Sequence, residues 1–422
     1  MNSNIVGLKN IGTLITLSSN ENGVKKGSQM NNLDIIPDAV MIFSTKILWV
    51  GTQQAFEKEM PSITCNEWID AKGKVVLPGF VDSHTHIVFA GDRSKEFALR
   101  LQGISYQEIA SSGGGILTTV QGVRNASKEE IVSNALSLVQ SATKYGTTCI
   151  EVKSGYGLTL ESELKLLHAI REVAENSTTT IIPTFMGAHD IPVEYKSNRE
   201  AYISLICNEM IPAVAEGELA EFCDVFTDTG YFTIDETKEI LSVSTSFGMK
   251  SKIHADELTT VNATELACEI GAYSADHLLH ISQNGIDALS KSQRTVATLL
   301  PGTAYTLGLP YAPARKLIDS GAMVALATDC NPGSCFTENM QIILSLACMN
   351  MNMSIEESIV ASTLHGAKAL GLEKHKGSIE IGKDADFIVL NTINYSDLVY
   401  HFGTNLVDQT WIGGTLNNLN LQ

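Results

Sequence analysis

Eight short apolar runs alternate with amphipathic stretches through the middle of this chain, and no other feature limits its fold more. Helical patterns such as 160–174, 234–246 and 312–320 lie between most of the runs. Strand and helix repeated eight times within roughly 300 residues favour a (β/α)8 barrel. An open doubly wound sheet is the alternative, but the glycine fingerprint expected at its first strand-to-helix turn is missing. The runs cover 78–86, 147–153, 180–187, 221–227, 249–255, 273–279, 295–300 and 323–329.

The two ends of the chain differ from the middle. Alternating polarity and β-branched residues there indicate short strands joined by polar turns. The predicted strands are 11–17, 38–43, 47–50, 377–381, 386–390 and 410–412.

Composition excludes several classes of protein. Apolar residues make up 44% of the 422 positions, enough to bury a large core and to exclude a disordered chain. The formal net charge of −18 opposes binding to nucleic acid or anionic membranes, so an anionic substrate needs a local positive site. Eight scattered cysteines, no CxxC pair, no signal peptide and no long apolar stretch predict a cytoplasmic protein with reduced thiols.

Polar residues that break the apolar runs lie mainly at the carboxyl ends of the runs. That face carries the active site in a barrel. The first run ends with His84 and His86, which share one face of a strand because they are two residues apart. His254 ends the fifth run, His277 ends the sixth and Asp329 ends the eighth. A single buried histidine is more often structural, but this set indicates one shared site.

His84, His86, His254 and Asp329 offer three nitrogen ligands and one oxygen ligand. Such a set suits one Zn²⁺ or one iron ion, Fe²⁺ or Fe³⁺, and leaves a position open for water. An ion of this kind lowers the pKa of its water to near neutral.

Proton transfer needs further groups. Glu257 and His277 are the candidates, together with Asp329 as an acceptor of the water proton. Glu257 could instead be an exposed carboxylate at the start of a helix.

Two groups of segments carry a resemblance to known families. Segments 78–86 and 377–387 resemble the first strand and the C-terminal return of the amidohydrolase superfamily. Segments 89–93, 151–157, 185–189, 254–257 and 329–334 resemble, more narrowly, the imidazolonepropionase family, and 153–157 and 329–334 discriminate best.

This resemblance covers essentially the whole chain. It implies a barrel of residues 76–374 and a small β-sandwich formed by 1–75 and 375–422. It also implies hydrolysis of 4-imidazolone-5-propanoate to N-formimidoyl-L-glutamate in histidine degradation, and a homodimer, which is common among such barrels.

A substrate of this kind is a cyclic amide with a propanoate tail. Arg93, a short loop beyond the first strand, suits the carboxylate of that tail, although it could make only a surface salt bridge. His189 or His277 could donate to the oxyanion that forms at the ring carbonyl. The other predicted substrate contacts are Tyr106, Tyr156, Glu257, Asn331, Gly333 and Ser334.

The lysines bear on the number of metal ions. Binuclear members of the superfamily bridge two ions with a carboxylated lysine on the fourth strand, but the fourth run here contains no lysine. We therefore predict one ion. Lys153 ends the second run, where it could supply positive potential, pair with Glu151 or another carboxylate, or serve only as the end of a strand.

Two other functions fit parts of the pattern. A cytosine- or guanine-type deaminase uses the same mononuclear ligand plan, but a neutral base has no need of Arg93. A catalytically silent barrel that acts as a scaffold would not need the complete set of ligands and proton carriers.

Overall fold

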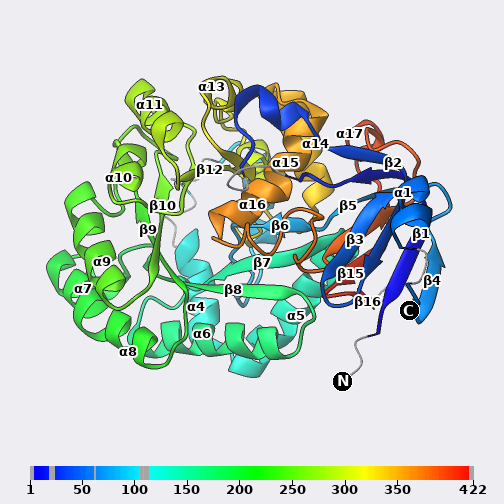
Figure 1. Ribbon diagram of the computed structural model, residues 1–422. Helices are drawn as coiled ribbons and strands as arrows, with labels where there is room; N and C mark the ends of the chain where they lie inside the picture. The colour runs from blue at the N-terminus through cyan, green and yellow to red at the C-terminus, as the bar shows by residue number, and fades with distance from the viewer. Residues whose placement is uncertain (1–3, 19–23, 61–62, 105–107, 109–113, 418–422) are drawn as a thin grey trace.

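The computed structural model describes residues 4–18, 24–60, 63–104, 108 and 114–417. Eight parallel strands form one sheet in the order β13-β12-β11-β10-β9-β8-β7-β6, so each strand pairs with its neighbour in the chain. Each of them falls on one of the eight apolar runs, which confirms the predicted barrel (Figure 1). The strands are β6 (Phe80–Asp82), β7 (Thr147–Lys153), β8 (Thr180–Ala188), β9 (Phe222–Thr227), β10 (Lys250–Ala255), β11 (Ser274–His277), β12 (Val296–Leu299) and β13 (Val324–Leu326).

Segments that follow the first and last strands close the barrel. The backbone N–H of Asp329 donates to the carbonyl of His84 at 3.0 Å. Two residues earlier in the chain, the Asp82 carboxylate accepts hydrogen bonds from the backbone N–H of Thr328 at 3.0 Å and from its hydroxyl at 2.6 Å. This seam brings the segment after β6 beside the segment after β13.

Helices cover the outside of the barrel, and three of them match the helical patterns of the sequence. These are α6 (Leu160–Glu175), α9 (Ile234–Ser246) and α13 (Ala314–Asp319). Helix α9 begins at a capping box, in which Thr233 and Glu236 satisfy each other's backbone N–H groups. The other α-helices of the described residues, of which α1 packs on the second sheet, are α1 (Gln53–Glu59), α2 (Ser94–Leu101), α4 (Ile116–Asn125), α5 (Lys128–Lys144), α7 (Arg199–Leu205), α8 (Ile211–Glu216), α10 (Ala263–Glu269), α11 (Gln283–Lys291), α12 (Pro301–Leu307), α14 (Met340–Met351), α15 (Ile355–Ser362), α16 (Leu364–Ala369) and α17 (Asp397–Tyr400).

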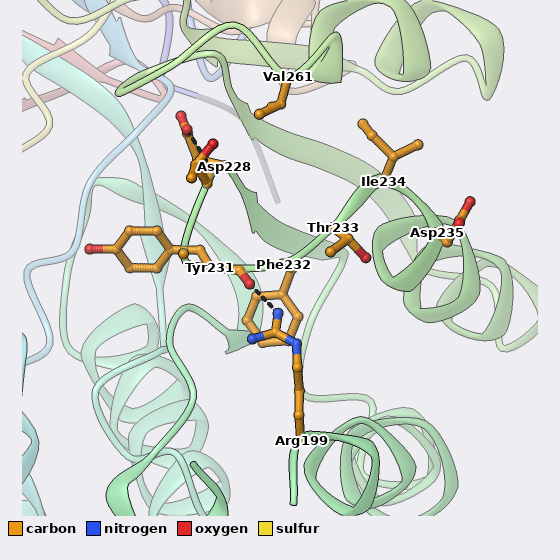
Figure 2. A pocket seen from close by; sticks show the side chains of 10 residues that line it. Arg199, Asp228, Tyr231, Phe232, Thr233, Ile234, Asp235 and Val261 are labelled. Carbon is orange, nitrogen blue, oxygen red and sulfur yellow. Dashed lines mark hydrogen bonds between the residues drawn. The ribbon is translucent and has the colours of Figure 1, made fainter. Parts of the chain in front are cut away.

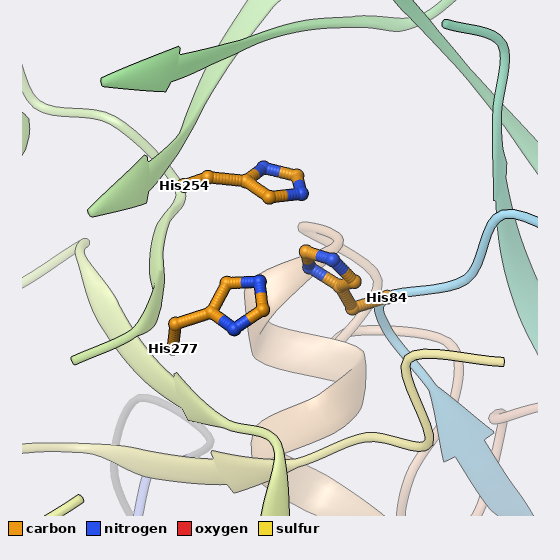
Figure 3. Close-up of side chains that lie close together, drawn as sticks. All are labelled: His84, His254 and His277. Carbon is orange, nitrogen blue, oxygen red and sulfur yellow. The ribbon is translucent and has the colours of Figure 1, made fainter. Parts of the chain in front are cut away.

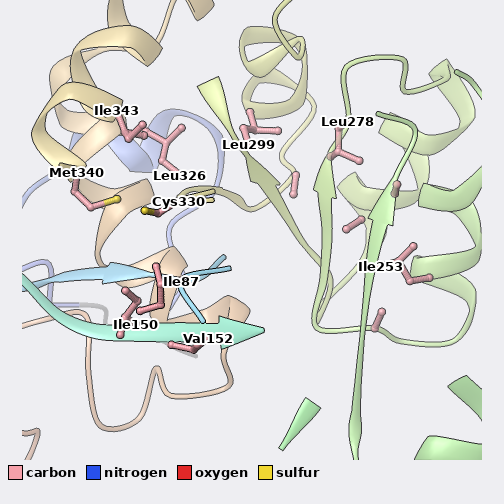
Figure 4. Packing of buried hydrophobic residues seen from close by; sticks show 14 of the residues in the cluster. Ile87, Ile150, Val152, Ile253, Leu278, Leu299, Leu326, Cys330, Met340 and Ile343 are labelled. Carbon is pink, nitrogen blue, oxygen red and sulfur yellow. The ribbon is translucent and has the colours of Figure 1, made fainter. Parts of the chain in front are cut away.

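Strand β7 shows how the barrel separates apolar from charged side chains. Ile150 and Val152, both labelled in Figure 4, belong to the main hydrophobic core and share one face of the strand because they are two residues apart. Glu151 and Lys153 alternate with them and therefore point to the other side, into the barrel. Lys153 contacts Asp224 on β9, which is not a neighbour of β7, so this contact crosses the barrel interior.

A second sheet, largely antiparallel, joins the two ends of the chain. Its order is β16-β15-β14-β5-β1-β2-β3, with β4 paired to β1, and Figure 1 shows its blue and red strands side by side. Phe43, Phe387 and Trp411 pack within it, with ring centroids 5.0–5.6 Å apart. The strands are β1 (Val6–Ile15), β2 (Ile35–Phe43), β3 (Ile47–Thr52), β4 (Glu67–Asp70), β5 (Val75–Pro78), β14 (Phe387–Leu390), β15 (Val407–Ile412) and β16 (Thr415–Asn417).

One predicted strand, 377–381, is wrong. Gly377 has a φ of +84°, which a strand does not allow, and the segment forms a turn. The N–H of Ile379 donates to the carbonyl of Thr16 at 2.8 Å, and the Ile379 side chain is buried. The segment is not a strand of either sheet. The domain boundaries at 75/76 and 374/375 stay a prediction.

None of the helices in the described part of the chain combines the length and apolar character needed to cross a bilayer.

Candidate active site

Three histidine rings converge at the carboxyl ends of the barrel strands. His84 follows β6, His254 lies on β10 and His277 ends β11, and Figure 3 shows the three rings close together. The ring centroids of His84 and His254 are 4.5 Å apart. His86 and Asp329 complete the cluster, because ligand atoms of His84, His86 and Asp329 all lie within 4.8 Å of one another.

The spacing of these atoms fits one metal ion. Nε2 of His86 lies 3.3 Å from Nε2 of His84 and 3.4 Å from Nε2 of His254. Oδ1 of Asp329 lies 3.5 Å from Nε2 of His84 and 3.6 Å from Nε2 of His86. Ligand atoms about 2.0–2.2 Å from a tetrahedral ion lie about 3.3–3.6 Å from one another. The four measured separations fall in that range.

Protonation also suits a metal site. Nδ1 of His84 lies 2.7 Å from a carboxylate oxygen of Asp276, and Nδ1 of His254 lies 3.1 Å from one of Asp224. The ring proton therefore belongs on Nδ1, and Nε2 presents a lone pair to the cluster. Burial, followed by nearby cationic groups, lowers the pKa of His84 and His86 well below the usual value, so both rings are neutral. Burial raises the pKa of Asp329 to about 6.

Three residues that end or follow barrel strands have a left-handed backbone conformation. Asp256, His277 and Asp329 have φ values of +50°, +78° and +53°, although none is glycine. Each such residue costs about 1–3 kcal/mol and persists only where its surroundings hold it. The Asp256 carboxylate, for example, accepts hydrogen bonds from the backbone N–H groups of Val261 and Thr264. Two of the three, His277 and Asp329, are predicted functional residues, and Asp256 directly precedes a third, Glu257.

The two predicted proton carriers meet beside the cluster. Nε2 of His277 lies 3.5 Å from Oε2 of Glu257. Burial, with the charges of Asp329 and Asp228, raises the pKa of Glu257 well above its usual value. Burial and His254 lower the pKa of His277 well below its usual value. These two shifts favour a protonated Glu257 carboxyl beside a neutral His277 imidazole.

Arg93 is buried rather than exposed at the surface. Its Nε and Nη2 lie 3.0 and 2.9 Å from the Glu96 carboxylate, so it makes a salt bridge, but a buried one. A Cβ on Gly333 would lie 2.1 Å from Nη1 of Arg93, so only glycine allows the guanidinium to approach. Glu96 was not predicted from the sequence. A carboxylate three residues after an arginine, at the start of a helix, is the signal that could have found it.

Tyr156 and His189 lie beside His86 in the cluster. The His189 ring stacks on His86 with centroids 5.1 Å apart, and the Tyr156 ring centroid lies 5.9 Å from that of His86. Nδ1 of His189 lies 3.0 Å from the carbonyl of Gly155. Burial lowers the pKa of His189 to about 3, so the ring is neutral, donates from Nδ1 and accepts at Nε2.

Glu163 was also not predicted, and it shapes the loop that carries Tyr156. Its carboxylate accepts hydrogen bonds from the N–H groups of Gly155, Gly157 and Leu158 at 2.7–3.0 Å. No local motif marks it, because its partners precede it in an irregular turn.

The loop after β13 is organised by Asn331. Its Oδ1 accepts from the N–H groups of Gly333 and Ser334 at 2.8 and 2.7 Å, and its Nδ2 donates to the carbonyl of Asp329 at 2.7 Å. The structure therefore brings these predicted residues beside Asp329. Tyr106 lies outside the described residues.

A pocket of about 650 Å³ lies after β9, and its lining residues do not include the clustered histidines (Figure 2). None of its lining residues is a predicted site residue. One of them, Asp228, accepts hydrogen bonds from the N–H of Leu258 and the hydroxyl of Thr259 at 2.8 and 2.6 Å. The pocket wall thus anchors the segment that carries Glu257, while the converging side chains lie elsewhere.

The sequence model of the amidohydrolase family matches residues 75–416, and the chain belongs to that family. A protein named imidazolonepropionase from Symbiobacterium thermophilum is 45% identical over 399 residues, covering 94% of this chain and 93% of the relative. Another imidazolonepropionase, from Thermoanaerobacter pseudethanolicus, is 47% identical over 383 residues, covering 90% and 91%. Within the amidohydrolases, the chain is a member of the imidazolonepropionases.

Solved structures share the fold at much lower identity. A triazine hydrolase variant superposes with a TM-score of 0.73 at 14% identity, over 98% of this chain and 94% of that chain. The guanine deaminase of E. coli superposes with a TM-score of 0.69 at 16% identity, over 98% of both chains. This likeness concerns the barrel and its second sheet only.

Proposed function

We propose that this chain hydrolyses the ring amide C–N bond of 4-imidazolone-5-propanoate to give N-formimidoyl-L-glutamate, a step of histidine degradation. The observation that carries the proposal is the convergence of three Nε2 atoms and one carboxylate oxygen at 3.3–3.6 Å, in a chain of the imidazolonepropionase family. The deaminase alternative shares the fold and the mononuclear ligand plan, but the deaminase structure is only 16% identical to this chain, whereas imidazolonepropionases are 45–47% identical.

The proposed ligands of one zinc or iron ion are His84, His86, His254 and Asp329. When bound, such an ion supplies a water molecule of lowered pKa and polarises the ring carbonyl. The donor set supports zinc and iron equally, because imidazole nitrogen and carboxylate oxygen suit both.

The chain's own groups then handle the protons. His277, whose lowered pKa favours the neutral ring, is the proposed acceptor of a proton from the water, and Glu257, whose raised pKa favours the protonated carboxyl, is the proposed donor to the leaving ring nitrogen. Water thus gives its oxygen to the ring carbon, and the broken C–N bond ends as N–H. His189 presents an acceptor at Nε2, so we assign it to a ring N–H and not to the oxyanion.

Substrate orientation falls to Arg93 and the surrounding loops. Arg93 is a buried cation in a chain of net charge −18, and it suits the propanoate carboxylate. Asn331, Gly333 and Ser334 hold the adjacent loop, and Tyr156 lies near the ring. Tyr106 remains a proposed substrate contact.

A direct assay tests this function. Purified protein with Zn²⁺ should consume imidazolonepropanoate, seen as loss of the ring absorbance, and should release formimidoylglutamate. Guanine and cytosine serve as control substrates. Turnover of either base, with none of the anionic ring, would replace the proposal with the deaminase reading.

Two further expectations concern the cellular form. We propose that the enzyme works in the cytoplasm as a homodimer. All eight cysteines are free, as a reducing compartment requires, and Ile393, Tyr400 and Phe402 are exposed apolar side chains that a partner could cover. Sedimentation analysis checks the dimer.

A further inference from the structure

Five charged side chains fill the barrel interior beneath the histidine cluster, and the proposed chemistry uses none of them. All five have no solvent exposure. We call them the lysine–carboxylate network: Glu151, Lys153, Asp224, Lys252 and Asp276.

Glu151 joins the two lysines. Its Oε1 lies 2.7 Å from Nζ of Lys153 and 3.1 Å from Nζ of Lys252. The hydroxyl of Thr184 donates to the same oxygen at 2.6 Å. Two cations and a hydroxyl therefore share one buried oxygen, which fixes both ammonium groups relative to each other.

Each lysine also holds a carboxylate that contacts a proposed metal ligand. Nζ of Lys153 lies 2.8 Å from Oδ2 of Asp224, the oxygen that lies 3.1 Å from Nδ1 of His254. Nζ of Lys252 lies 3.8 Å from Oδ2 of Asp276, the oxygen that lies 2.7 Å from Nδ1 of His84.

Lys252 reaches His84 by a second route. Its Nζ donates to the carbonyl of Ser83 at 2.7 Å, directly before His84 in the chain. The contacts thus run without a break from His84 through the network to His254.

Stability alone does not account for this arrangement. Buried ion pairs are often no better for stability than apolar residues of the same volume, because the charges must be dehydrated. A carboxylate behind a metal-bound histidine, in contrast, fixes the ring and its tautomer, and its loss typically weakens metal binding 10- to 100-fold. A carboxylate without its lysine would be a buried unpaired charge. It would no longer be held in the orientation that contacts Nδ1 of the histidine ring.

We propose that Lys153 and Lys252 are positioning residues that act through Asp224 and Asp276 on His254 and His84, with Glu151 joining both halves. The inference rests on the proposed metal site. Its consequence is that the affinity for the ion depends on two lysines that are not among the proposed ligands.

Lys153→Met and Lys376→Met form a matched pair for the test. Lys376 is a buried lysine paired with Asp384 and Asp386, outside the barrel interior. Both variants remove one buried ammonium group and should lower resistance to urea. The Zn²⁺ dissociation constant, measured by competition with a chromophoric chelator, should rise about 10- to 100-fold only in Lys153→Met.

Co²⁺ provides a spectroscopic readout. The d–d bands should change in Lys153→Met and stay as in the unaltered protein in Lys376→Met. Equal Zn²⁺ affinity and equal Co²⁺ spectra in the two variants would overturn the inference. Failure of the unaltered protein to bind one Zn²⁺ would instead refute the metal site itself.

Glu151→Gln covers the case in which Lys153→Met does not fold, because it keeps the shape and removes only the central charge. Its Zn²⁺ dissociation constant should rise about threefold or more. In the double variant Lys153→Met, Lys252→Met the two effects should be non-additive, as expected for groups in one network. An unchanged affinity in Glu151→Gln, or strict additivity, would contradict the joining role of Glu151.

Discussion

The barrel interior and the core of the second sheet are both buried, but the first is lined by charged side chains and the second by aromatic and aliphatic ones. Beneath the histidine cluster lie two lysines and three carboxylates without solvent exposure, whereas Phe43, Phe387 and Trp411 fill the second sheet with stacked and edge-on rings. Apolar burial gives stability at no cost in dehydrated charge. Buried charge costs stability and gives fixed geometry. The comparison indicates that the second sheet mainly stabilises the fold, while the charged barrel interior orients the proposed ligands. Substitutions in the sheet should therefore lower the unfolding free energy, and substitutions at the cluster should lower zinc binding and turnover.

Asp329→Ala should produce the largest effect. It removes one proposed ligand, so turnover of imidazolonepropanoate should fall on the order of 1000-fold or more, and bound zinc should be lost. Unfolding in urea should change little by comparison. Steady-state kinetics and metal analysis of the purified variant measure this, and full activity would refute the ligand set.

Phe387→Ala should show the reverse pattern. Loss of a fully buried ring should cost about 3–5 kcal/mol of unfolding free energy. At a temperature where the variant is still folded, kcat and zinc content should match those of the unaltered protein. Urea denaturation gives the first quantity and kinetics the second. A tenfold fall in kcat would show that the two regions are not separate.

Arg93→Ala should act on binding alone. A lost charge-assisted contact is worth roughly 1.5–4 kcal/mol, so KM should rise about 10- to 1000-fold with zinc still bound. Arg93→Lys, which keeps the charge but not the planar fork, should recover part of the loss. Untouched activity toward the anionic ring would show that the anion assignment is wrong.

His365→Gln tests a buried polar group outside both regions. Burial lowers the pKa of His365 to about 4 in the folded chain, against about 6.5 when unfolded. As the pH falls from 6.5 to 4, the unfolded state takes up a proton that the folded state refuses. The unfolding free energy should therefore fall by up to about 3 kcal/mol in this window. Urea curves at pH 7 and pH 4.5 should show a smaller acid loss in the variant.

Much of the barrel and its proposed metal ligands could be predicted from the sequence, because each depends on local order. Apolar runs marked the strands, and polar residues at the ends of the runs marked the rim. His84, His86 and His254 follow from that rule alone.

The lysine–carboxylate network could not be predicted in the same way. Lys153 meets Asp224 across the interior, so the pairing depends on how eight strands are staggered around the barrel. The charges themselves were visible as interruptions within apolar runs, and a pair of Lys153 with Glu151 was one of the alternatives, but the contacts to Asp224 and Lys252 were not named. The irregular segment 377–381 was missed for a related reason, since its buried residue Ile379 is held by a distant backbone contact.

The seam of the barrel gives the order of synthesis a meaning. When the ribosome has made residue 328, three of the four proposed ligands exist, but the fourth and the hydrogen bond from Asp329 to His84 do not. Asp329 thus contributes a backbone hydrogen bond to the seam and is also the fourth proposed ligand. A chain that stops short of it has neither a closed cylinder nor a reaction centre.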